Sequence, residues 1–523
     1  MTRIRKVNFD NSHENSVRSL LDIATVMMLM RSLPRMTAKA MLLFVCCLQH
    51  VNASPAIEAG DAVLRHDIQL LADRGILTGP VTTWPLSWGP VLADLRLYEP
   101  TGNESKGVLD SIARLKVRAD WETAVNRLTW SARASVAENP IGIRGYENTP
   151  REPGEIGAGV SWTGERLSVT LKGQLVDSTD DGAKGRVDGS LLGIAVGNWV
   201  ISANTLDRWW GPGMDGGLIL SNNARPIPAL SLDRNFTPAF GLPLLHWLGP
   251  WDLNMLFGQM ESSREIPNTQ FFGLRLNFRP LPSLEVGFSR TAQWCGDGRP
   301  CDAGTFFDLL VGKDNLGDGG IDRANEPGNQ LAGVDLRWAP LIAGRRVAFY
   351  GQFIGEDEAG GLPSRFIGQI GIETGGYSEY LGSWRWFGEF AGTSCRFYES
   401  DAIFNCGYNH GIYRTGYRYR GRSIGHGADN DAELYSTGLQ LISANDTHWG
   451  VLIRSGDLNR GGSPDFSHTL TPTPLDIVSI DFSYGRLFKF GMVEIGVGYQ
   501  ELAEHPGGDV SDSRFYMQWR SGY

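Results

Sequence analysis

The sequence predicts a mainly β protein, a transmembrane antiparallel β-barrel of about 18 strands with a small N-terminal periplasmic α-helical domain. Three observations predict this fold. From about Arg127 onward, apolar and polar residues alternate, as in a strand with one apolar face. The alternating segments are each about ten residues long, which suits a tilted strand that crosses a bilayer. The last of them carries Phe515, Trp519 and Tyr523 in phase.

A soluble β-sandwich or β-propeller is the competing fold for an alternating sequence. Strands of soluble proteins are usually about five or six residues long, shorter than the segments here. Propeller blades also repeat a fixed signature, and these segments do not. The membrane barrel is therefore the predicted fold, with an even number of strands.

Residues 1–53 are typical of a signal-peptide region that is removed on export. Met36 opens a short basic start, which makes it the predicted start codon, and residues 40–48 (AMLLFVCCL) form an apolar run. Ala53 is a small residue before a cleavage point at Ser54. The apolar run is too short for a membrane anchor.

Residues 54–125 are predicted to form the helical domain, on the periplasmic side. Apolar residues recur at intervals of three and four from Val63 to Leu77, the period of an amphipathic helix. A short second helix is predicted over 90–97 and a third over 107–120.

Residues 126–523 are predicted to form the barrel, with the clearest alternation at 166–177 and 492–500. The predicted periplasmic turns are 279–282, 443–446 and 486–489, and the predicted extracellular loops are 292–328 and 457–474. Two irregularities interrupt the strand count. One crossing is hidden between 206 and 251, and another slip falls between 384 and 431.

The segment 207–230, DRWWGPGMDGGLILSNNARPIPAL, fits no helix or strand pattern. We expect Trp209 and Trp210 at the outer end of a strand, in the aromatic girdle of the membrane interface. Residues 216–223 then form either the hidden descending strand or an inward fold that fills the lumen. Pro226 and the proline two residues later disfavour a continuous central strand beyond that point. The inward fold is the preferred interpretation.

The run YRTGYRYRGR at 413–422 is predicted to be a strand with two unlike faces. Its tyrosines would point to the lipid headgroups and its arginines into the lumen. Such a row of guanidiniums would attract the carboxylates of an acidic polysaccharide. The alternative is that the arginines pair with lumenal carboxylates such as Glu373, Glu389 and Glu433.

Trp384 and Trp386 share one face of a predicted strand. We expect that face to contact lipid, with a sugar-stacking platform as the alternative.

Four cysteines remain after removal of the signal peptide. They form two local pairs, Cys295 with Cys301 and Cys395 with Cys406, which predict two disulfides in an exported protein. The spacing does not match a zinc site.

No metal and no cofactor are expected. The run DNLGDGGID at 314–322 partly resembles a calcium loop, but Leu316 offers no oxygen and Asn325 replaces the terminal Glu. The net charge of −10 excludes a typical nucleic-acid binder. The sequence holds no paired histidines of a zinc enzyme, so a binding protein is predicted rather than an enzyme.

Two motifs carry a resemblance to a known family. DRWWGPGMDGGLILSNNARPIPALSLDR (207–234) and ADRGILTGPVTTWPLSW (72–88) resemble the signature of the capsule-assembly Wzi family, and the similarity covers essentially all of the chain after the leader. The resemblance implies a lectin-like β-barrel in the outer membrane of a Gram-negative bacterium. Its implied role is to retain or assemble capsular or extracellular polysaccharide at the cell surface.

The predicted partners are that polysaccharide and outer-membrane lipid, with the polysaccharide-export machinery as a further candidate. A diffusion porin and a barrel-borne outer-membrane hydrolase are the alternative functions. The residues predicted to bind polysaccharide are Asp207, Arg208, Trp209, Trp210, Asn222, Asn223 and Arg225, followed by Arg414, Arg418, Arg420 and Arg422. Their amide and guanidinium groups would bond sugar hydroxyls and carboxylates, while the indoles would stack.

Overall fold

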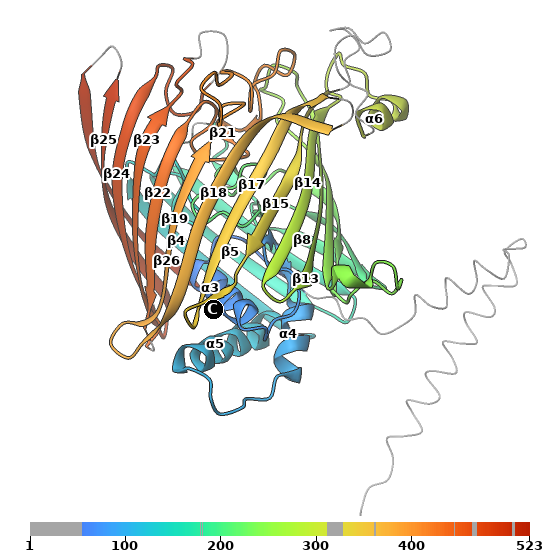
Figure 1. Cartoon of the computed structure of the whole chain (residues 1–523), viewed down its shortest axis with the longest axis vertical. Helices are drawn as coiled ribbons and strands as arrows, with labels where there is room; N and C mark the ends of the chain where they lie inside the picture. Colours follow the sequence, from blue (N-terminus) through green and yellow to red (C-terminus); the bar gives the residue numbers. More distant parts are fainter. Residues whose placement is uncertain are drawn as a thin grey trace, which may run out of the picture. The chain divides into compact units, whose positions relative to one another are not determined.

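A computed structural model describes residues 55–177, 179, 181–310, 328–359, 362–443, 445–462, 468–504 and 508–522. The predicted leader and the loop 314–322 lie outside these residues. Figure 1 shows a barrel of long strands with a group of helices at one end.

Three helices make up the N-terminal domain, and they are α3 (Ala62–Asp73), α4 (Trp88–Leu97) and α5 (Lys106–Glu122). The Asp61 carboxylate accepts an amide proton from the first turn of α3 at 3.0 Å, and the Ser87 hydroxyl does the same for α4 at 3.2 Å. The apolar faces of α3 and α5 meet at Leu71 and Leu115, which are fully buried. No helix in the described part of the chain is long and apolar enough to cross a membrane.

Eighteen long strands form one closed barrel within the described residues, once the two-residue strands β7 and β16 are set aside. This agrees with the predicted number. The long strands are β4 (Leu128–Glu138), β5 (Gly154–Thr163), β6 (Leu167–Asp177), β8 (Leu191–Val196), β9 (Trp199–Asn204), β11 (Ala229–Arg234), β12 (Trp251–Gln259), β13 (Gln270–Leu281), β14 (Leu284–Trp294), β15 (Gly328–Trp338), β17 (Arg345–Ala359), β18 (Leu362–Ser378), β19 (Gly382–Gly392), β22 (Glu433–Ile442), β23 (Thr447–Leu458), β24 (Leu475–Phe488), β25 (Gly491–Glu504) and β26 (Asp509–Ser521).

Shorter elements lie between or beside the long strands. They are β1 (Ala56–Ile57), β2 (Thr83–Trp84), β3 (Leu86–Ser87), β7 (Gly185–Arg186), β10 (Trp209–Trp210), β16 (Leu341–Ile342), β20 (Arg418–Tyr419), β21 (Arg422–Ser423), the 3-10 turn η1 (His246–Leu248) and helix α6 (Ala303–Leu310).

The barrel is an antiparallel meander in which each long strand pairs with the next along the chain. β26 closes the ring on β4, with Met517 opposite Val136. Short turns follow β13, β22 and β24 at the end that carries the helices, and long connections follow β14 and β23 at the other end. The three predicted turns therefore share one end of the barrel and the two predicted loops begin at the other, although the third turn begins after Phe488.

The alternation of the sequence matches the two faces of the wall. On β25, Ile495, Val497 and Tyr499 face outward, while Glu494 is fully buried on the lumenal side. On β19, Trp386 is 38% exposed on the outer face. The prediction that Trp384 and Trp386 share an outer, lipid-directed face agrees with this arrangement.

Both predicted irregularities have a structural cause. β11 is the hidden crossing, and it starts immediately after Pro228, which precedes the first strand residue rather than interrupting the ladder. Residues 216–223 are therefore not the descending strand. The second irregularity is an insertion rather than a crossing, because β19 pairs directly with β22 and residues 393–432 leave the wall between them.

The helical domain packs against side chains that the strands direct into the lumen. Asp73 of α3 forms an ion pair of 2.7 Å with Arg337 of β15, and both side chains are at least nine-tenths buried. The Glu285 carboxylate of β14 accepts the amide protons of Val81 and Thr82 at 3.0 and 2.8 Å. Charged side chains on the inner wall thus bind the backbone of the domain in place of water.

Candidate functional site

Three segments enter the barrel from the end opposite the helices, and we call them together the lumenal plug: 139–153, 205–228 and 393–432. Their contacts are with lumenal side chains of the wall. Gln352 of β17 donates to the Trp210 carbonyl at 2.9 Å, and Gln369 of β18 donates to the Gly216 carbonyl at 3.0 Å. The predicted inward fold of the central segment is therefore confirmed.

The position of the two adjacent tryptophans corrects a prediction. Trp209 and Trp210 are 0% and 1% exposed inside the barrel and are not part of an outer aromatic girdle. As β10 they pair with β2 of the helical domain, where Trp209 lies opposite Trp84. The girdle prediction failed because a tryptophan pair near a strand end carries no signal that separates a lipid contact from an interior one.

Trp209 joins the plug to the helical domain. Its ring lies 5.2 Å from that of Tyr146, in an edge-to-face arrangement, and its Nε1 donates to the Gly213 carbonyl at 3.2 Å. The guanidinium of Arg65 on α3 lies over both rings, 4.3 Å from the Tyr146 centroid. The site thus combines residues from three distant parts of the sequence.

The Gly-Pro-Gly turn presents backbone amides to a single wall carboxylate. Gly211 adopts a φ of +126°, which only glycine reaches without strain. The amides of Met214, Asp215 and Gly216 then donate to Glu389 of β19 at 2.6, 3.1 and 3.1 Å. Because three backbone amides donate to one buried carboxylate, the turn is fixed to the wall.

A buried ion pair anchors the same turn to β23, two strands along the wall from β19. The carboxylate of Asp215 accepts two bonds from Arg454 of β23, at 2.6 and 2.9 Å. Both side chains are almost completely buried. Two parallel hydrogen bonds between the guanidinium and the carboxylate fix the orientation of the Asp215 side chain as well as its distance from Arg454.

Asp207 and Arg208, predicted to bind polysaccharide, are buried at the start of the plug. Asp207 pairs with Arg151 at 3.0 Å, and Arg208 donates to Asn204 at 2.7 Å. Asn222 and Asn223 are also buried and bond backbone carbonyls of the other two plug segments, at Tyr146 and Ser423. These contacts assign them a structural place, and a direct contact with sugar remains a prediction.

The run 413–422 corrects a second prediction. It is not a wall strand but a plug segment that contains the two-residue strands β20 and β21. Tyr413, Tyr417 and Tyr419 are buried inside the barrel rather than directed to lipid headgroups. The Tyr417 hydroxyl donates to the Ile219 carbonyl at 2.7 Å. Period-two alternation predicted a strand here, but the glycines and the interior contacts decide the conformation.

Arg418 forms the interior ion pair that the alternative interpretation of this run expected, but with a different partner. It binds both oxygens of Asp429 at 2.8 Å, and the two side chains are 2% and 0% exposed. Glu373, Glu389 and Glu433 instead bind Arg337 and Arg385, the amides of the Gly-Pro-Gly turn, and Arg460.

The other predicted arginines lie nearer the surface of the loop end. Arg225 and Arg420 share the carboxylate of Asp181, at 2.5 and 3.3 Å, and Arg225 also binds Asp188. Arg422 is half-buried and Arg414 is exposed. The structure therefore brings Arg225 of one plug segment beside Arg420 of another, a proximity that sequence spacing does not reveal.

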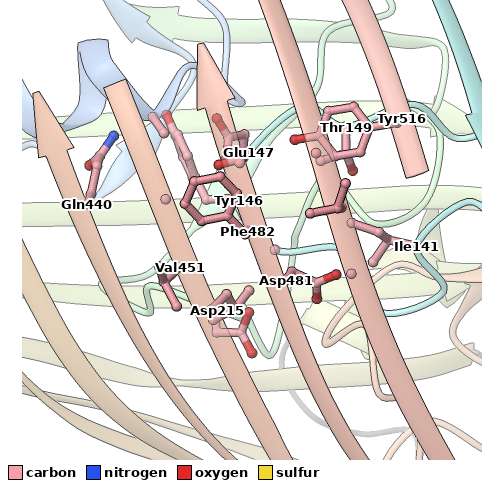
Figure 2. A pocket seen from close by; sticks show the side chains of 18 of the residues that line it. Ile141, Tyr146, Glu147, Thr149, Asp215, Gln440, Val451, Asp481, Phe482 and Tyr516 are labelled. Carbon is pink, nitrogen blue, oxygen red and sulfur yellow. The ribbon is translucent and has the colours of Figure 1, made fainter. Parts of the chain in front are cut away.

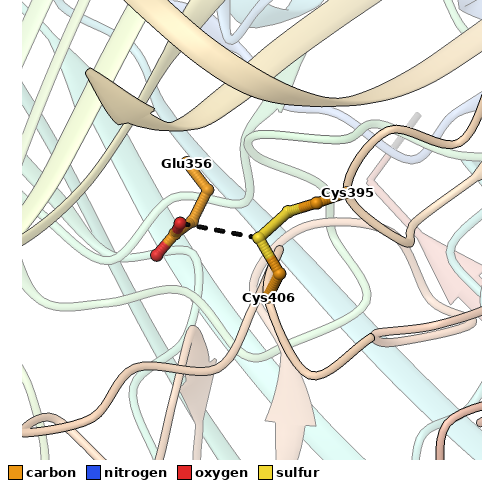
Figure 3. A group of neighbouring side chains, drawn as sticks. All are labelled: Glu356, Cys395 and Cys406. Atoms are coloured by element: carbon orange, nitrogen blue, oxygen red, sulfur yellow. Dashed lines mark hydrogen bonds between the residues drawn. A yellow bond between two sulfur atoms is a disulfide. The ribbon is translucent and has the colours of Figure 1, made fainter. Parts of the chain in front are cut away.

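Both predicted disulfides are present, Cys295–Cys301 and Cys395–Cys406. Figure 3 shows the Glu356 carboxylate beside the second bridge, 3.6 Å from Cys406 Sγ. The two sulfurs are bonded to each other, so this group offers no thiolate to a metal.

Glu147, His448 and Glu494 are a second group whose potential ligand atoms lie close together. The Glu494 carboxylate already accepts from Tyr516, Gln518 and Arg520, at 2.7, 2.9 and 3.1 Å. We therefore interpret this group as part of an ion-pair network.

Several structurally central residues carried no sequence signal. Arg65 and Tyr146 connect the helical domain to the plug through buried contacts, and Arg144 joins two plug segments by donating to the Asn222 carbonyl. They lie in a helix and a loop of ordinary composition, and only the fold shows that their side chains meet.

A closed barrel with an apolar outer face and a lumen occupied by its own loops defines the class of this protein as an outer-membrane β-barrel with a plugged lumen. Residues 129–503 match the capsule assembly protein Wzi family, and the chain belongs to that family. The predicted resemblance is thereby confirmed.

Two known proteins are similar over most of their length. An uncharacterized 55.8 kDa protein in the cps region of Klebsiella pneumoniae is 31% identical over 371 residues, which are 70% of this chain and 69% of that protein. The solved structure of Wzi from Escherichia coli has 25% identity and a TM-score of 0.77, and the match covers 90% of this chain and 100% of that one. That Wzi is described as a carbohydrate-binding β-barrel of the outer membrane involved in group 1 capsule assembly. The outer membrane is the location of the present chain, as predicted.

Proposed function

We propose that this protein binds capsular or extracellular polysaccharide at the loop end of the barrel and thereby retains or assembles it on the cell surface. The observation that supports this proposal most directly is the plug, in which three loops fill the lumen and are fixed by buried ion pairs such as Arg454–Asp215. A barrel built in this way presents a rigid loop surface. Membership of the capsule assembly family supports polysaccharide as its ligand.

The surface arginines are the best candidates for direct contact. Arg225, Arg414, Arg420 and Arg422 lie at or near the surface of the loop end and would bind carboxylates of an acidic polymer. The seven buried members of the predicted set would act indirectly, by fixing the loops that carry these arginines. The helical domain then faces the periplasm, where the export machinery is its predicted partner.

The plug disfavours the porin alternative, because an open pore requires a water-filled lumen. We also propose that the protein acts by binding and not by catalysis.

The proposal is tested by the distribution of polysaccharide between cells and medium. We expect a strain that lacks the gene to release polymer into the medium at unchanged total yield, and the wild-type gene to restore retention. The double variant Arg225→Gln/Arg420→Gln should restore it only in part. Arg96→Gln, at an exposed position of α4, is the matched control and should restore it fully. Unchanged distribution in the deletion strain would contradict the retention role.

A further inference from the structure

A cavity of about 160 Å³ lies between α3, the plug and the inner wall of β19 and β22–β26 (Figure 2). The cavity borders the wall at glycine positions, since Gly450, Gly496 and Gly498 all line it. Figure 2 shows Tyr146, Glu147 and Thr149 of one plug segment around the same space as Asp215 and Asp481. None of the four arginines of the proposed surface site lines this cavity.

Unpaired polar atoms line the cavity. Both ring nitrogens of His66, which is 2% exposed, find no hydrogen-bond partner among the described residues. The same holds for the Tyr146 hydroxyl and for one nitrogen each of Arg65, Arg385 and Arg514. A buried polar atom without a partner is costly, so a lining with several of them favours a polar occupant.

The charge of the lining favours an anion. Four arginines line the cavity against three carboxylates, from Glu147, Asp215 and Asp481. Asp215 and Asp481 are already bound by Arg454 and Arg514. The Arg65 guanidinium donates through another of its nitrogens to the carbonyls of Pro212 and Gly213 and lies over the rings of Tyr146 and Trp209. Its charge has no carboxylate within bonding distance among the described residues.

The remaining surface suits hydroxyl and C–H groups. Burial lowers the pKa of His66 well below its usual value, so the ring is neutral, with one donor and one acceptor nitrogen. Ile141, Phe387 and Leu452 supply apolar surface to the lining. At about 10–15 Å³ per enclosed water, the cavity holds on the order of ten water-sized groups, comparable to one monosaccharide.

The cavity continues toward the helix-bearing end of the barrel. Ala62, Glu147 and His448 line both the cavity and a neighbouring groove between α3, α5 and the ends of β23 and β25. Ala62 is the first residue of α3, so its side chain stands at the passage between the two spaces. A ligand would enter there, at the end of the barrel opposite the proposed surface site.

We propose that this cavity is a second binding site, which takes one carboxylate-bearing sugar unit from the helix-bearing end of the barrel. Arginine donors bind the carboxylate, His66 and Tyr146 bind hydroxyls, and the apolar surface contacts the C–H face. The ligand is either a free sugar acid or the terminal unit of a chain. This site does not depend on retention of polymer by the loop end.

Equilibrium dialysis of the purified full-length protein in detergent, with labelled glucuronate, tests the proposal. We expect saturable binding, and about tenfold to hundredfold weaker binding of glucose, since a hydrogen bond to a charged group is lost. Acetate should bind at least tenfold more weakly than glucuronate. Equal binding of acetate would overturn a sugar site, and absence of saturable glucuronate binding would overturn the proposal. A glucuronate-terminated disaccharide that competes as well as glucuronate assigns the site to chain ends, and one that does not compete assigns it to the free acid.

Two variants locate the binding. Ala62→Trp should close the passage and lower glucuronate binding at least tenfold, whereas Ala113→Trp, exposed in the neighbouring groove only, should leave it unchanged. His66→Leu removes unpaired atoms without removing a described hydrogen bond, so the protein should fold and bind at least tenfold more weakly. Wild-type affinity in both Ala62→Trp and His66→Leu would contradict the site. Retention of polymer by cells is a separate measurement, so the two proposals can fail independently.

Discussion

The barrel wall and the lumenal plug are built by different interactions, although they lie side by side. The wall is a continuous ladder of backbone hydrogen bonds. For example, β24 pairs with β25 along its whole length, from Leu475 to Phe488. The plug has only two-residue strands such as β10 and depends on side chains such as Arg454, Arg418 and Trp209. A wall of this kind tolerates single side-chain changes. When one anchoring side chain of the plug is removed, few other contacts can hold the same segment.

The largest difference is expected between two tryptophans. Trp209→Ala leaves a cavity in a buried apolar cluster and should cost about 3–5 kcal/mol in the stability of the contact between plug and helical domain. Trp386→Ala removes an outward side chain and should cost about 1 kcal/mol or less. Hydrogen exchange of residues 205–228 measures the effect, and equal protection in both variants would refute the comparison.

The next effect concerns the buried pair of Arg418 and Asp429. Burial alone would raise the pKa of Asp429, but the Arg418 guanidinium, together with His468 and the Thr469 amide, lowers that pKa below its usual value. A lowered carboxyl pKa gives stability that is complete above about pH 4 and declines as the pH falls through the folded-state pKa. Asp429→Asn should loosen residues 393–432 by about 1.5–3 kcal/mol at pH 7.

Hydrogen exchange at pH 7 and at pH 3 checks this prediction. The wild-type segment should lose protection at the lower pH, and the Asp429→Asn segment should change less. Equal acid sensitivity in both proteins would assign the effect to other groups.

The smallest effect is expected for an exposed pair of the same segment. Arg396 lies 3.6 Å from Glu399, and both side chains are more than a third exposed. Glu399→Gln should therefore change the protection of residues 393–432 by about 0–1 kcal/mol. A loss as large as that of Asp429→Asn would show that burial does not decide which charges hold the plug.

The same contrast explains which parts of the structure could be predicted. The wall follows from period-two alternation, because outward residues such as Val497 must be apolar and lumenal ones such as Glu494 need not be. The disulfides followed from cysteine spacing. The plug could be predicted only as an inward fold, since its contacts with the wall join residues more than a hundred positions apart, as in Gln352 with Trp210. The alternation was most misleading at 413–422, where the tyrosines and Arg418 form hydrogen bonds and ion pairs inside the barrel.

The central claim is that the plug closes the lumen, and planar-bilayer conductance tests it most directly. Purified wild-type protein should show no stable ohmic channel, while the double variant Asp215→Ala/Asp429→Ala, which removes one anchor from each of two plug segments, should show frequent openings. Stable, high conductance of the wild-type protein would contradict a closed lumen and favour a diffusion pore.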